Sequence, residues 1–208
     1  MIVYVARHGE TDWNREGRYQ GRRESRLTAT GRAQAAALAR ALEGVSVGRV
    51  VSSPLARCAE TAEPIALQHR VSLEKDARLI EIAHGAWEGR LRADIEREDP
   101  STMRAWREQP QQVAFDGGES LDEVLERWRA FAGELAGNDD VILVTHDVVV
   151  RLAILEATHR SAARLWEPRV VNGGYARFAI GDGNWQLLDE CVDDHLGGLR
   201  VDTARQAL

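Results

Sequence analysis

The chain has 208 residues, and its 33 acidic side chains outnumber its 27 basic ones, for a formal net charge of −6. This length suits a single domain over residues 1–208 with a substantial core. The negative charge argues against nucleic acid as a partner. Because there is no apolar run of ~18 residues and no charged-then-apolar leader, we expect no membrane partner. Two widely separated cysteines, Cys58 and Cys191, suit reduced thiols and a cytoplasmic location.

Apolar runs and helical periodicity alternate along the chain. The first run, residues 2–6, is typical of a buried strand and leads directly into Arg7-His8-Gly9-Glu10. In chain order we then predict a helix over 28–43, a strand over 49–53, a helix over 54–69, short helices and loops over 90–116, a helix over 119–136, a strand over 141–145, a helix over 148–158, and a hairpin of 175–180 with 185–191 around the turn 181–184. Residues 193–208 are expected to form a partly ordered tail.

Polar side chains stand where three of these apolar strands end. His8 follows the first, His146 follows the strand over 141–145, and Ser53 is predicted to cap a helix that carries Arg57 in its first turn. Apolar strands that alternate with helices indicate an α/β fold, a three-layer sandwich with a mostly parallel central sheet and helices on both faces. Ligands bind at the carboxyl ends of such strands. We therefore expect Arg7, both histidines and Arg57 to form a cationic cup for a small dianion.

A cluster of arginines precedes and enters the first long helix. Its members are Arg15, Arg18, Arg22, Arg23, Arg26 and Arg32. One interpretation is a solvated surface, and the other is attraction of anionic substrates toward the cup. The sequence leaves both open.

Several blocks of the sequence, taken together and in order, resemble the histidine phosphatase superfamily, the phosphoglycerate-mutase-like proteins. They span residues 1 to about 155, which is most of the chain. The blocks are Arg7-His8-Gly9-Glu10-Thr11-Asp12-Trp13-Asn14, Gln20-Gly21, Leu27-Thr28-Ala29-Thr30-Gly31-Arg32, Ser52-Ser53-Pro54-Leu55-Ala56-Arg57, Leu79-Ile80-Glu81-Ile82, Gly85-Ala86-Trp87-Glu88-Gly89, Gly117-Gly118-Glu119-Ser120 and Val144-Thr145-His146.

The resemblance implies a role for each catalytic side chain. His8 would be the nucleophile that takes the phosphoryl group as a phosphohistidine. Arg7, Arg57 and His146 would hold the nonbridging oxygens of that group. Glu81 would protonate the leaving oxygen and then activate water, although Glu88 lies nearby in the sequence.

The resemblance also implies residues that bind the substrate. Asn14, Gln20 and Gly21 would add donors to the phosphate or to the group that carries it. Asp147 stands where the family usually has glycine, and it would tune specificity or cap the following helix. No metal and no organic cofactor is required, because the arginines supply the positive charge.

The compact length favours a phosphatase that hydrolyses a small phosphomonoester, such as a sugar phosphate or a phosphoglycerate derivative. Three alternatives stay open at this point: a phosphoglycerate mutase, a module that binds phosphorylated ligands without turnover, and a metal-dependent hydrolase. The expected partner is the small-molecule substrate. A homodimer through an exposed sheet edge is a further option.

Overall fold

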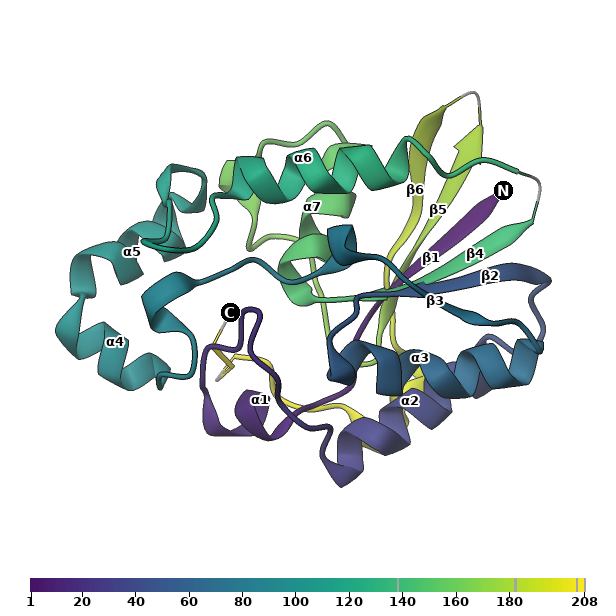
Figure 1. The fold of residues 1–208 in the computed structure, drawn as a ribbon, viewed down its shortest axis with the longest axis horizontal. Coiled ribbons are helices and arrows are strands. Elements are labelled where there is room, and N and C mark those ends of the chain that lie inside the picture. Colours follow the sequence, from purple (N-terminus) through teal and green to yellow (C-terminus); the bar gives the residue numbers. More distant parts are fainter. Residues whose placement is uncertain (138, 182, 205, 208) are drawn as a thin grey trace.

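A computed structural model describes residues 1–137, 139–181, 183–204 and 206–207. Within these residues a single sheet has the strand order β3-β2-β4-β1-β5-β6. The neighbouring pairs β1/β4, β2/β4 and β2/β3 are parallel, whereas β5 and β6 run antiparallel at one side (Figure 1). The strands are β1 (Ile2–Arg7), β2 (Val47–Ser52), β3 (Leu73–Lys75), β4 (Asp140–Thr145), β5 (Tyr175–Gly181) and β6 (Asn184–Val192). The predicted α/β architecture is confirmed.

The central strand β1 shows why apolar residues fill both faces of the sheet. Alternate side chains of a strand point to opposite faces. Val3 and Val5 accordingly belong to one buried cluster, while Tyr4 and Ala6 belong to a second one on the other face. A strand that is buried on both faces must be apolar throughout, which is the pattern in the sequence.

Helices cover each of these two clusters. In Figure 1, α2 (Ala29–Ala41) and α3 (Ala56–His69) lie on one face, and α6 (Leu121–Ala132) and α7 (Asp147–Ala157) lie on the other. Three further helices lie beyond the carboxyl ends of the parallel strands. They are α1 (Asp12–Glu16), α4 (Arg92–Glu98) and α5 (Pro100–Glu108).

The start of α3 differs from the prediction. The helix begins at Ala56 with Leu55 as its N-cap, two residues later than expected, and it continues through Pro64. The Ser53 side chain does not cap it; the hydroxyl is bonded to His146 at the sheet edge and accepts from the Leu55 amide at 3.4 Å. Arg57 still lies in the first turn.

The C-terminal segment is packed against the body of the protein, where the sequence predicted a partly ordered tail. A short 3₁₀ segment, η5 (Asp194–Leu199), contacts α2 and buries Leu196. Further on, Gln206 and Ala207 are also buried. Three positions named in the predictions, Asp182 of the hairpin turn and residues 205 and 208, lie outside the described part of the chain.

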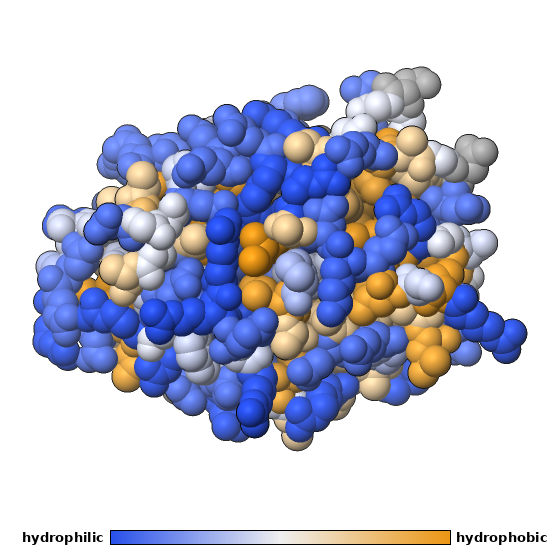
Figure 2. Space-filling model, viewed as in Figure 1, coloured by the Kyte–Doolittle hydropathy of each residue, from blue (hydrophilic) through white to orange (hydrophobic). Residues whose placement is uncertain are grey.

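In the same view as Figure 1, most of the surface is hydrophilic, and apolar residues show at the centre and toward the strand ends on the right (Figure 2). None of the helices in the described ranges is long and apolar enough to cross a bilayer.

Candidate active site

The sheet register places three strand ends side by side. Arg7 of β1 pairs with Thr145 of β4, and Ser52 of β2 pairs with Val144 of β4. The residues that follow, His8, Ser53 and His146, therefore leave the same edge of the sheet. The amide of His8 donates to the Thr145 carbonyl at 3.0 Å, so the alignment persists one residue past the strand.

The imidazole of His8 has a defined tautomer. Its Nδ1 lies 2.7 Å from the carbonyl oxygen of Gly9. Because a carbonyl only accepts, Nδ1 must carry the proton, and the lone pair is on Nε2. Burial, reinforced by the positive charges of Arg57 and Arg7, holds the pKa of His8 well below its usual range. The ring is therefore neutral at neutral pH.

His146 is bonded on the side away from solvent. Its Nε2 lies 2.8 Å from the hydroxyl oxygen of Ser53, and the Sγ of Cys58 lies 3.3 Å from the same nitrogen. The rings of His8 and His146 meet edge to face, with their centroids 5.3 Å apart. Burial, followed by the positive charge of Arg57, also lowers the pKa of His146 well below its usual range.

Arg57 is held by main-chain oxygens of the loop after α1. Its two terminal nitrogens donate to the carbonyls of Arg23 and Gly21, at 2.9 and 2.7 Å. Its Nε has no hydrogen-bond partner among the described residues. Gly21 has φ +51°, and a Cβ there would lie 2.0 Å from an oxygen of Glu88, so this position requires glycine.

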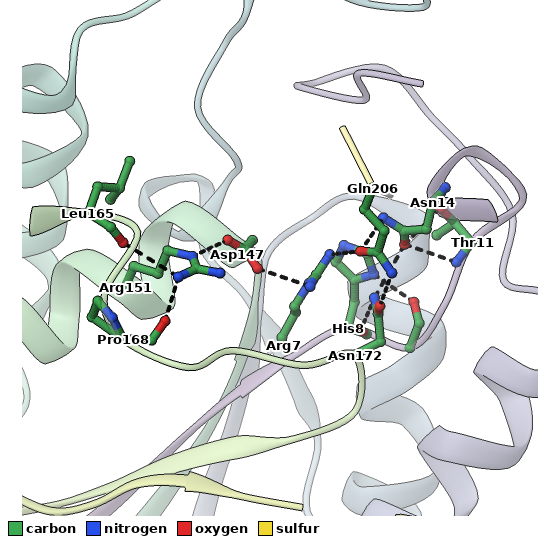
Figure 3. Close-up of polar contacts among 11 residues, drawn as sticks. Arg7, His8, Thr11, Asn14, Asp147, Arg151, Leu165, Pro168, Asn172 and Gln206 are labelled. Carbon is green, nitrogen blue, oxygen red and sulfur yellow. Dashed lines mark hydrogen bonds and ion pairs between the residues drawn. The ribbon is translucent and has the colours of Figure 1, made fainter. Parts of the chain in front are cut away.

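Arg7 is held from two sides (Figure 3). Its Nη1 forms an ion pair with Asp147 at 2.9 Å, and its Nη2 donates to the side-chain oxygen of Gln206 at 2.6 Å. Its Nε has no hydrogen-bond partner within the described ranges. Arg7 and Arg57 are both only 1% exposed. Buried guanidinium groups with unused donors form a strong anion-binding arrangement.

The two glutamates that the sequence left in competition lie in different environments. Glu81 lines the cavity between the arginines, and burial, together with the negative charge of Asp147, raises its pKa to about 7. The carboxylate of Glu88 accepts from the backbone amides of Arg22 and His84, both at 3.1 Å. Glu88 therefore joins two loops, and Glu81 faces the reaction space.

A chain of carboxamides runs beside Arg7, on the side away from Asp147 (Figure 3). Asn14 donates to the Gln206 side-chain oxygen at 3.2 Å, and Gln206 in turn donates to Asn172 at 2.8 Å. Asn172 also donates to the His8 carbonyl at 3.2 Å. The sequence predicted Asn14 but missed the other two. The only local signal is that Asn172 precedes Gly173-Gly174; nothing in the sequence around Gln206 marks it.

The side chains enclose a small cavity with a volume of about 10 Å³, roughly the space for one water molecule. Of the residues predicted to bind substrate, Gln20 and Gly21 line it, whereas Asn14, Asp147 and also the predicted catalytic His146 stand behind the lining. The lining residues are Arg7, His8, Gln20, Gly21, Arg57, Glu81, His84, Val148 and Ala207.

His84 lines this cavity and packs against aromatic side chains that lie outside the lining. Its ring lies edge to face against Tyr19 and Phe115, with centroids 4.9 Å away in each case. Both of its ring nitrogens lack a hydrogen-bond partner among the residues described. Burial lowers its pKa to about 3, so the imidazole is neutral and can donate to a ligand without adding charge.

The arginine cluster of residues 15–32 is largely engaged with neighbouring groups. Arg18 bonds to the carbonyl of Gly89, and Arg22 forms an ion pair with Glu119. Arg23 has a 62% exposed side chain at the rim. In the described part of the chain, no group of three His, Cys, Asp or Glu side chains is placed to hold a metal ion.

Comparison with known proteins agrees with this geometry. The sequence profile of the histidine phosphatase superfamily (branch 1) matches residues 3–192. Phosphoserine phosphatase 1 of Hydrogenobacter thermophilus is 33% identical over 96% of both chains. The adenosylcobalamin/alpha-ribazole phosphatase of Escherichia coli is 29% identical over 99% of this chain and 97% of its own. The solved structure of Bacillus stearothermophilus YhfR superposes with a TM-score of 0.88 at 30% identity, covering 94% and 98% of the two chains.

Buried arginines and paired histidines at the carboxyl edge of a parallel sheet define a phosphoryl-binding α/β enzyme. The chain belongs to the histidine phosphatase superfamily. The family, the fold and the class of activity predicted from the sequence, hydrolysis of phosphate monoesters, are confirmed.

Proposed function

We propose that this protein hydrolyses a small phosphorylated metabolite by way of a phosphohistidine on His8. The observation that carries the proposal is the bond from His8 Nδ1 to the Gly9 carbonyl, since it leaves the Nε2 lone pair free to attack. The lowered pKa supports the same role, because a neutral imidazole needs to lose no proton before it reacts.

In the first step, a bond forms from Nε2 to phosphorus as the bond from phosphorus to the alcohol oxygen breaks. The guanidinium groups of Arg7 and Arg57 stabilise the charge of the transferring group. Glu81, with a pKa of about 7, is substantially protonated near neutral pH and gives its proton to the leaving oxygen. The products are the free alcohol, the phosphohistidine and a Glu81 carboxylate.

In the second step, water attacks the phosphohistidine and passes a proton to the Glu81 carboxylate. The nitrogen–phosphorus bond breaks, inorganic phosphate leaves, and His8 returns to its neutral form. One carboxyl group thus acts first as an acid and then as a base, which requires a pKa near the working pH.

The alcohol part of the substrate fits an outer cavity of about 410 Å³, whose lining residues Gln206 and Tyr19 contact Arg7 and His84 of the first cavity. Gln206 lines this outer cavity and also bonds to Arg7, so it must leave Arg7 before a phosphoryl oxygen can take that donor. Aromatic and arginine side chains dominate the lining, which suits a small polar or anionic alcohol. The residues are Tyr19, Arg92, Trp106, Arg107, Arg151, Trp166, Thr203, Ala204 and Gln206. The relatives, a phosphoserine phosphatase and an adenosylcobalamin/alpha-ribazole phosphatase, support small phosphate esters as the substrate class.

The test is phosphate release from p-nitrophenyl phosphate in EDTA, followed by a panel of phosphorylated serine, glycerate, sugar and ribazole compounds ranked by kcat/KM. We expect turnover in EDTA and the highest kcat/KM for one alkyl phosphate. Phosphate binding without release would indicate a binding module, and activity that needs added metal would indicate a metal-dependent hydrolase. Transfer to a second hydroxyl in place of water would indicate a mutase.

Three features of the proposal come from the sequence alone and stay predictions. They are a cytoplasmic location, a reaction without metal or organic cofactor, and a homodimer through a sheet edge. The edges available for the dimer are β3 and β6.

A further inference from the structure

Asp147 lies between two arginines at the first position of α7 (Figure 3). One carboxylate oxygen forms an ion pair with Arg7 Nη1 at 2.9 Å, and the other is paired with Arg151 Nε. Asp147 is 1% exposed, and it does not line the catalytic cavity. Its carboxylate therefore affects the reaction only through other side chains and does not contact the substrate.

Arg151 fixes the position of that carboxylate. Its Nη1 donates to the Pro168 carbonyl and lies 3.5 Å from the Leu165 carbonyl. Its guanidinium also lies 5.3 Å from the centroid of the Trp166 ring. Arg151 is only 7% exposed, so the partner that holds the Asp147 carboxylate is itself buried and anchored.

Arg7 is oriented by this pair. An arginine side chain has many rotamers, and holding one of them before the substrate arrives removes an entropic cost from the reaction. The ion pair with Asp147 holds the Nη1 side of Arg7, although neither Nη1 nor Asp147 Oδ2 has a hydrogen-bond partner among the described residues. Nε and the Nη2 side, now on Gln206, are left for a phosphoryl oxygen. Asp147 also balances part of the charge of two buried cations, whose burial without an anion would be strongly unfavourable.

We propose that Asp147, held by Arg151, is a positioning residue for phosphoryl transfer: it fixes the Arg7 guanidinium. The inference rests on the proposed function, because it needs Arg7 at the phosphoryl group and Glu81 as the acid. Removal of the Asp147 charge is then expected to alter both the use of Arg7 and the pH at which Glu81 loses its proton.

Charged and titratable groups face Glu81 from each element around it. The negative charge of Asp147 raises the pKa of Glu81, and Arg57 and Arg127 lower it. The full set is Arg7 and His8 at the end of β1, Arg57 and Cys58 on α3, His84 on the same segment as Glu81, Arg127 on α6, and His146 and Asp147 at the start of α7. The substitution Asp147→Asn removes the Asp147 charge and leaves the other groups of this set in the chain.

The experiment compares Asp147→Asn with the matched variant Asp193→Asn. Asp193 is also a carboxylate between two arginines, Arg169 at 2.6 Å and Arg200 at 2.9 Å, and it lies outside the catalytic cavity. For both variants, kcat/KM for an alkyl phosphate is measured against pH. A double-mutant cycle then combines Asp147→Asn with Arg7→Ala.

Asp147→Asn should lower kcat/KM by roughly 10- to 100-fold, as misplacement of a substrate-positioning group does. The descending limb of its pH profile should move to lower pH by roughly one unit, because a nearby negative charge has been removed. In the Arg7→Ala background the same substitution should have a clearly smaller effect. Asp193→Asn should leave the descending limb of the kcat/KM profile at the wild-type pH, even if the substitution changes the melting temperature.

A second variant covers the case in which Asp147→Asn does not fold. Arg151→Lys keeps both charges and loses the contact to the Pro168 carbonyl, so kcat/KM should fall and the limb should stay in place. Additive effects of Asp147→Asn and Arg7→Ala, with an unmoved limb, would overturn the inference while leaving the proposed function intact; so would a wild-type rate in Arg151→Lys. A wild-type enzyme without phosphatase activity would instead overturn the proposed function.

Discussion

The carboxyl ends of β1 and β4 carry the same short pattern, an apolar strand followed by a histidine, and the two imidazoles are nevertheless bonded differently. His8 donates from Nδ1 to its own neighbour's carbonyl and turns Nε2 toward the cavity. His146 uses Nε2 for the Ser53 hydroxyl and stands behind the lining. One repeated motif thus gives an imidazole with a free nitrogen at the cavity and another whose Nε2 is bonded to Ser53, because the hydrogen-bond partners of each ring decide which nitrogen is free.

Removal of each histidine in turn tests the roles of His8 and His146, and it should give the largest effect. His8→Ala should lower turnover by on the order of 10⁴-fold or more, since the nucleophile is lost. His146→Ala should lose on the order of 10²-fold, the scale for misplacement of the reacting groups, because His146 stands behind the lining and supports it. Acid quenching with labelled substrate should find acid-labile, alkali-stable phosphate in the wild type and in His146→Ala, and none in His8→Ala. Label retained in His8→Ala would reverse the two roles.

The next effect concerns Arg57, which lowers the pKa of both histidines. Arg57→Ala should reduce kcat/KM by on the order of 10²-fold, and Arg57→Lys should restore little, because a point charge cannot reproduce the planar fork. Arg23→Ala is the control, since Arg23 contacts Arg57 only through its backbone carbonyl, and the Arg23 side chain is exposed. Near-normal rates in Arg57→Lys would show that charge alone suffices at this position.

The pH dependence of the rate separates Glu81 from the two histidines, because both imidazoles are uncharged near pH 7. The protonated acid is the active form, so kcat/KM for an alkyl phosphate should fall as pH rises above about 7, the pKa of Glu81. The substrate's own second ionisation, near pH 6, adds a rising limb below that range. With p-nitrophenyl phosphate the falling limb should be weak, since nitrophenolate leaves without a proton.

Substitution of the two glutamates separates their roles in the same assays. Glu81→Gln should slow alkyl phosphates far more than it slows the nitrophenol burst, and phosphohistidine should accumulate because water is no longer activated. Glu88→Gln should show neither effect, because Glu88 bonds to backbone amides outside the cavity. The reverse pattern would assign the acid to Glu88.

The smallest expected effect lies behind His146. Ser53→Ala removes the hydroxyl bonded to His146 Nε2 and should reduce kcat/KM by roughly 2- to 10-fold, the range of one neutral hydrogen bond. Ser52→Ala is the control, because the Ser52 hydroxyl is buried and has no hydrogen-bond partner among the described residues. Equal losses in both variants would point to packing and not to the orientation of the imidazole.

The sequence was sufficient for the strand ends and for the side chains that follow them directly. Apolar runs marked β1 and β4, and the register of a parallel sheet brings the residues after them together. The start of α3 was predicted two residues early because Ser53 and Pro54 make a good local helix start. A tertiary contact, the bond from Ser53 to His146, outweighed that local preference.

Groups that reach the site from distant segments could not be predicted in this way. Gln206 and Asn172 come from the C-terminal segment and from the loop before β5, and no periodicity marks them. Asp147 was expected to tune substrate specificity or to cap the following helix, because it stands where the family usually has glycine. Its spacing of four residues from Arg151 on α7 was the available signal that its carboxylate belongs to an ion pair.

The main-chain hold on Arg57 has a consequence for how this enzyme can diverge. The carbonyls that fix the guanidinium belong to Gly21 and Arg23, and every amino acid supplies a carbonyl, so sequence drift at residues 22 and 23 leaves that catalytic contact in place. Gly21 is the exception, because any side chain would collide with Glu88. Laboratory evolution toward a new phosphate ester can therefore randomise residues 22 and 23 at the rim while the phosphoryl-transfer machinery stays unchanged.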